Sequence, residues 1–147
     1  MKKVFFVLLS IALVALGLSA CQPAPEGPQL ELSGIWGRPS PMVAGNGAAY
    51  LVIENTGSED DKLLNAYSDV ADTVELHDMT MENDVMKMFK VDYMEIPAGG
   101  KLELQPGGKH VMFIGLHQQL EVGQIVTVEL EFEKSGMQTI EVEIKEP

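Results

Sequence analysis

The chain has 147 residues and a formal net charge of −12, with 22 acidic side chains against 10 basic ones. This acidic balance argues against a nucleic-acid ligand and against docking on an anionic lipid surface. A single cysteine, Cys21, excludes an internal disulfide.

The first twenty residues have the form of an export signal. Two lysines precede an apolar run over 4–18, which is short for a membrane span of roughly 20 residues. The run ends in "LSAC" (18–21), and small residues before a cysteine are similar to the lipobox of bacterial lipoproteins. We predict a lipoprotein signal over 1–20, cleaved before Cys21, whose lipid would attach the protein to a membrane. An ordinary secretory signal is the alternative.

Residues 21–29 ("CQPAPEGPQ") are rich in proline and predict a semi-extended tether. From residue 30 onward, apolar and polar residues alternate with period two, and turn motifs interrupt the pattern roughly every eight to twelve residues. Strands are expected over 48–55, 62–68, 73–79, 85–91, 101–105, 110–116, 125–133 and 139–144. The sequence therefore predicts one domain over 30–147, an all-β antiparallel Greek-key sandwich of about eight or nine strands.

A histidine and four methionines crowd residues 77–88 ("HDMTMENDVMKM"), among acidic and amide side chains. Because alternate residues of a strand share a face, His77 and Met79 should point away from the core side chains Val74 and Leu76. His77 is therefore expected at the rim of the core.

The same rule groups further soft side chains. Met86 and Met88 should share one face of their strand, and His110 and Met112 should share one face of another. Thioether sulfur is a poor ligand for Ca²⁺ or Mg²⁺ but a good one for Cu(I), and imidazole also binds copper. A blue-copper centre is excluded, because it needs a thiolate and the one cysteine is at the lipid end.

The spacing of four of these residues resembles a known motif. Ten residues separate His77 from Met88, twenty-one separate Met88 from His110, and one separates His110 from Met112. This spacing is similar to the copper motif of the periplasmic copper chaperones called PCuAC. Residues 35–57 and 94–116 also look like that family, and the resemblance covers about 34–145.

This resemblance implies a cupredoxin-like sandwich that is not an enzyme and binds Cu(I) through His77, Met88, His110 and Met112. It further implies delivery of copper toward cytochrome c oxidase, through a copper-accepting assembly protein or an oxidase subunit. Met79 and Met86 are candidate auxiliary ligands, and we expect a monomer outside the cytoplasmic membrane. Many members have a Met- and His-rich tail, whereas this chain ends "EVEIKEP", so a second tight site is not expected.

Other functions stay open at this point. A copper buffer or resistance protein would need the same ligands without a delivery target. An adhesion module would bind no stoichiometric copper. A zinc site built from His77, His110 and His117 would leave the methionines unexplained, and His117 is otherwise expected on a surface loop.

Overall fold

The computed structural model describes residues 26–40, 45–82 and 84–146. The predicted signal over 1–20, Cys21 and most of the tether over 21–29 lie outside the described residues. Among the residues that are described, no helix is long and apolar enough to cross a membrane.

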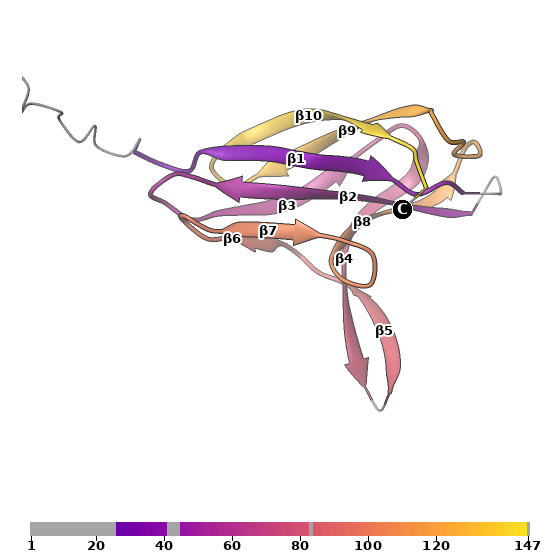
Figure 1. Cartoon of the computed structure of the whole chain (residues 1–147), viewed down its shortest axis with the longest axis horizontal. Helices are drawn as coiled ribbons and strands as arrows, with labels where there is room; N and C mark the ends of the chain where they lie inside the picture. Colours follow the sequence, from indigo (N-terminus) through magenta and orange to yellow (C-terminus); the bar gives the residue numbers. More distant parts are fainter. Residues whose placement is uncertain (1–25, 41–44, 83, 147) are drawn as a thin grey trace, which may run out of the picture.

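The described residues form ten β-strands in two antiparallel sheets, as Figure 1 shows. The strands are β1 (Leu30–Gly37), β2 (Asn46–Asn55), β3 (Asp61–Tyr67), β4 (Ala71–Glu82), β5 (Val85–Lys90), β6 (Met94–Ile96), β7 (Lys101–Leu104), β8 (His110–Leu116), β9 (Ile125–Phe132) and β10 (Gly136–Glu143). One sheet has the order β1-β2-β8-β4-β5, with β7 also paired to β2, and the other has the order β10-β9-β3-β6. The predicted all-β antiparallel sandwich is confirmed.

The prediction of eight or nine strands was too low, because β1 and β6 were not expected. In β1 the alternation is broken at Gly34, where φ is 59° and the register with β2 shifts between Ser33 and Trp36. Such a bulge destroys the period-two signal that identifies a strand. β6 has three residues and ends directly before Pro97, so it is too short to show a period.

The core lies between the two sheets, where alternate side chains of each strand meet. Phe113 and Ile53 from one sheet and Leu63 and Leu130 from the other are fully buried. Each such side chain contributes about 1.5–3 kcal/mol of burial free energy. The apolar residues that alternate with polar ones over the predicted strands 125–133 and 139–144 are all buried: Val126, Val128, Leu130, Phe132, Ile140, Val142 and Ile144.

The longest strand, β4, belongs half to the sandwich and half to a hairpin. Its residues Ala71 to His77 pair with β8, whereas His77 to Glu82 pair with β5. Figure 1 shows the two-stranded ribbon of β4 and β5 projecting away from the sandwich. At its tip Asp84 has a φ of 62°, a left-handed conformation that Asp tolerates in hairpin turns. His77 is therefore the residue at which β4 leaves the sandwich.

Candidate functional site

The register of the sheet gathers the predicted ligands on one face. Residues directly opposite each other in antiparallel strands project to the same side. The opposed pairs here are His77–His110, Glu75–Met112 and Met79–Met88. Since Leu76 and Val111 face the core, these six side chains lie on the outer face of the sheet, at the base of the hairpin.

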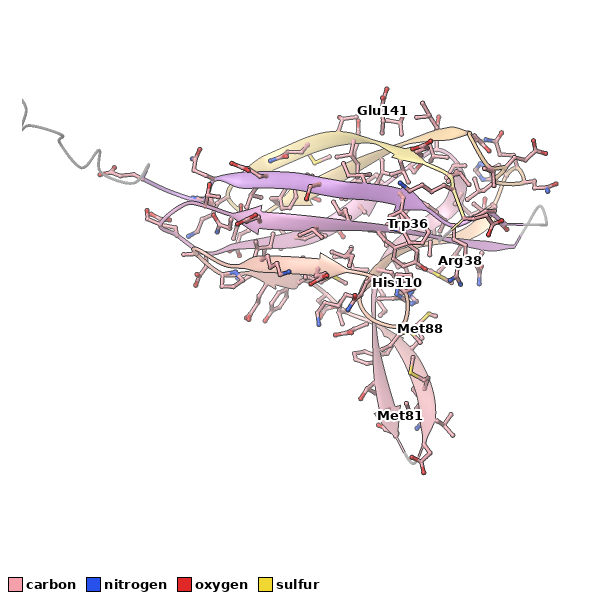
Figure 2. All side chains as sticks on the ribbon, in the orientation of Figure 1. Trp36, Arg38, Met81, Met88, His110 and Glu141 are labelled. Carbon is pink, nitrogen blue, oxygen red and sulfur yellow. The ribbon has the colours of Figure 1, made fainter. Side chains whose placement is uncertain are left out.

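A cavity of about 310 Å³ opens on this face. Its wall contains Arg38, Pro39, Asn46, Gly47, Ala48, Tyr50, Met79, Met88, Pro106, Gly107, His110 and Met112. Figure 2 shows His110 at the base of the hairpin, Met88 just beyond it, and Met81 near the tip. A larger hollow of about 580 Å³ beside Arg38 has no imidazole or thioether in its wall, so the smaller cavity is the chemically relevant one.

Four rings in a row support the site from the sheet side. Trp36 packs against Tyr50 with the ring planes tilted by 39° and the centroids 4.7 Å apart, and the ring of Tyr50 lies 6.4 Å from that of His110. The ring of His110 lies 5.7 Å from that of His77, which places His77 beside the cavity. Burial raises the pKa of Tyr50, so its phenol stays neutral and adds no charge to the site.

The backbone holds His110 in one tautomer. The residue is 4% exposed, and its ring Nδ1 lies 2.8 Å from the carbonyl oxygen of Gly108. A carbonyl oxygen can only accept, so Nδ1 carries the proton and donates it. The lone pair of the neutral ring is therefore on Nε2, the nitrogen left for a metal.

A carboxylate holds His77 in the opposite tautomer. Its Nε2 lies 2.8 Å from Oε2 of Glu75, and Glu75 also accepts a hydrogen bond from Lys90 at 3.0 Å. The hydrogen bond from His77, and then that from Lys90, lowers the pKa of Glu75 and keeps it ionised. The other nitrogen of His77, Nδ1, is buried without a hydrogen-bond partner. An orphaned buried nitrogen costs about 1–3 kcal/mol, and a metal ion would satisfy it.

The methionines differ in exposure and in their distance from the cavity. Met112 is half-buried in the cavity wall, and Met88 is 47% exposed. Met79, predicted as an auxiliary residue, lines the same cavity. Met86 is 46% exposed and lies farther along the hairpin, opposite Met81, which is 60% exposed. The predicted grouping of Met86 with Met88 on one face is confirmed by the register.

The three-histidine zinc site is wrong. His117 lies on an exposed bend after β8, as expected, with Nδ1 3.0 Å from the carbonyl oxygen of Asp69 and Nε2 2.8 Å from Oδ1 of Asp72. It is separated from His110 by the whole of β8. Within the described part of the chain, no three His, Cys, Asp or Glu side chains are gathered to hold a metal.

Sequence reasoning missed three supporting groups. The rule of alternate residues placed Glu75 on the same face as His77 but gave no reason to pair them. No sequence signal pointed to Tyr50 or to the carbonyl of Gly108, because both reach His110 through the folding of separate strands and loops.

Comparison with known proteins agrees with this architecture. Residues 30–144 match the protein family described as "Putative lipoprotein LpqE-like". The chain is 31% identical to "Putative lipoprotein Lxx21020" of Leifsonia xyli subsp. xyli, over 93% of this chain and 87% of that protein.

Two solved structures extend the comparison to the fold. The apo PCuAC domain from PmoF1 is 26% identical, with a TM-score of 0.69, over 84% of this chain and 98% of that one. The Cu(I) form of DR1885 from Deinococcus radiodurans is 26% identical, with a TM-score of 0.59, over 88% of this chain and 85% of that one. The resemblance to PCuAC domains is thus confirmed, and the chain belongs to the LpqE-like lipoprotein family.

Proposed function

We propose that this protein is a copper carrier, not an enzyme, which binds one Cu(I) ion through His77, Met88, His110 and Met112. One observation carries the proposal. The imidazole of His110 lines a cavity that thioethers also line, and the imidazole of His77 lies 5.7 Å from it. Each ring has one nitrogen tied to an oxygen acceptor and the other left with its lone pair. This is the arrangement by which proteins orient histidine ligands.

The ligand set suits a soft monovalent cation. Thioether and imidazole are neutral, so the site adds no ligand charge, and thioether sulfur favours Cu(I) over hard cations. The exposed Met88 would be the ligand that a partner reaches first. Copper would then leave stepwise, as each thioether or imidazole is replaced by a thiolate of the acceptor. The Cu(I) form of DR1885, a structural relative, supports this choice of metal.

The family supports a place of action for the protein. Membership in a lipoprotein family supports a domain held outside the cytoplasmic membrane by a lipid on Cys21. We propose that the monomer delivers Cu(I) there, toward cytochrome c oxidase, through an assembly protein or an oxidase subunit.

The metal site is tested by competition titration of Cu(I) between the full chain and a chromogenic chelator. Met88→Leu and Met112→Leu should each weaken Cu(I) binding, and the double variant should weaken it further. Met137→Leu is the matched control, because Met137 is 53% exposed on β10 of the other sheet. Unchanged affinity of the double variant would refute the ligand assignment.

Delivery is tested separately, by deleting the gene and growing cells in low copper. Loss of cytochrome c oxidase activity that added copper restores is the expected result. Sensitivity to high copper with normal oxidase activity would instead favour a buffer, and the delivery part of the proposal would be wrong.

A further inference from the structure

The hairpin carries more sulfur than the proposed copper site uses. Met79 and Met81 of β4 lie opposite Met88 and Met86 of β5, respectively, so four thioethers share one face of the ribbon. We call these four residues the thioether ladder. Its inner pair, Met79 and Met88, lines the cavity, whereas its outer pair, Met81 and Met86, lies toward the tip.

Both residues of the outer pair are exposed on the ribbon. Met81 is 60% exposed and Met86 46% exposed, although a long apolar side chain gains free energy by burial. Among the described residues, the opposite face of the ribbon carries an ion pair between Lys87 and Glu82 and two exposed apolar side chains, Val85 and Phe89, but no sulfur. The exposed sulfur is thus confined to the face that continues into the cavity.

The outer pair also approaches the cavity rim. A methyl group placed on Gly107 would lie 3.9 Å from Cε of Met86, and Gly107 is part of the cavity wall. Met86 therefore reaches from the hairpin to the edge of the cavity. Opposed residues of antiparallel strands have Cβ atoms about 4.5–5.5 Å apart, and successive pairs on one face are about 6.8 Å apart along the strand. Flexible methionine side chains can span both distances.

We propose that Met81 and Met86 form a second, weaker Cu(I) site at the hairpin, which captures the ion and passes it along the thioether ladder to the inner site. This inference rests on the proposed function, because the ladder leads to the ligands assigned above. Along the ladder one thioether would replace another on the metal, and at the inner site the neutral imidazoles would replace the last of the ladder's thioethers. Copper stays Cu(I), every sulfur stays neutral, and no electron or proton moves.

The outer pair should bind Cu(I) with lower affinity than the inner site. The outer pair offers two exposed thioethers and no imidazole, so it exchanges metal rapidly with solvent or with a donor. The inner site adds two oriented imidazoles in a partly enclosed cavity. Capture at the hairpin makes the second step intramolecular, which raises the effective concentration of copper at the inner site.

The capture site is tested by NMR of the full chain with ¹³C-labelled methionine methyl groups, titrated with Ag(I) as a redox-stable soft cation. The first equivalent should shift the methyl signals of Met88 and Met112. Further Ag(I) should shift those of Met81 and Met86 together, while Met137 stays unchanged. If Met81 and Met86 respond no more than Met137, the capture site does not exist. If Met88 and Met112 ignore the first equivalent, the proposed function fails instead, whatever the outer pair does.

Transfer is tested by stopped-flow loading from a weak Cu(I)–chelate complex. The variant Met81→Leu/Met86→Leu should keep the equilibrium affinity of the inner site. It should load copper at least about tenfold more slowly, because it no longer holds Cu(I) at a high effective concentration beside the inner site. Met137→Leu is again the control and should load like wild type. Equal loading rates in all three proteins would overturn the transfer role.

Discussion

The contact between Glu75 and His77 gives a quantitative test of the site. Replacing Glu75 by Leu removes the acceptor that fixes the proton on Nε2 of His77 and frees the ring to change tautomer. Loss of such a supporting partner typically costs 10–100-fold in metal affinity, or about 1.4–2.7 kcal/mol. Glu75→Gln keeps an oxygen acceptor and loses only the charge, so its loss of Cu(I) affinity should be about tenfold. The loss for Glu75→Leu should be about 100-fold.

The geometry supplies a control for this test. Glu75 also pairs with Lys90, whose side chain is 58% exposed, and exposed ion pairs contribute only about 0–1 kcal/mol. Lys90→Gln removes that pair and leaves the contact of Glu75 with His77 intact, so Cu(I) affinity should stay within about twofold of wild type. The assay is Cu(I) competition titration, with thermal unfolding to show that each variant folds. The reasoning is refuted if Glu75→Leu binds like wild type, or if Lys90→Gln weakens binding as much.

The remaining predictions concern folding and titration. Met88→Leu and Met112→Leu roughly conserve side-chain volume, so each should lower the free energy of unfolding, measured in urea, by no more than about 1.5 kcal/mol. Burial raises the pKa of Asp61, but four hydrogen bonds from three backbone N–H groups and the Ser135 hydroxyl outweigh it and leave the pKa below its ordinary value. Its stabilisation should be complete at neutral pH and disappear as pH falls through that lowered pKa, and Asp61→Ala should abolish this pH dependence in urea unfolding. The hydrogen bond to Asp72 raises the pKa of His117. NMR titration should therefore show a lower pKa of His117 in Asp72→Asn than in wild type.

The fold was predictable wherever one face of a strand is buried. In β9 and β10 the alternation of apolar and charged residues identified both the strands and their inward faces, because burial of one face imposes period two. The same rule failed at the bulge of β1 around Gly34 and in the short β6. It also gave no sign that β4 and β5 leave the sandwich, because β5 is rich in apolar residues that normally indicate burial, yet all of its residues are exposed.

The site was predictable only in part, for a related reason. The sequence placed His110 with Met112, and His77 with Met79, because each pair shares a strand. That His77 lies opposite His110 depends on the register between β4 and β8, which no local pattern specifies. The burial of His110 was likewise not predictable from its strand, because the residue is 4% exposed and its ring is held by the carbonyl of Gly108 in the preceding turn.

The central claim is that two imidazoles and two thioethers bind one Cu(I) ion at the base of the hairpin. Copper K-edge X-ray absorption of the full chain, loaded with one equivalent of Cu(I), tests it most directly. We predict two nitrogen and two sulfur scatterers in wild type, one nitrogen fewer in His110→Ala and one sulfur fewer in Met112→Leu. A spectrum without sulfur, or one that neither substitution changes, would contradict the account.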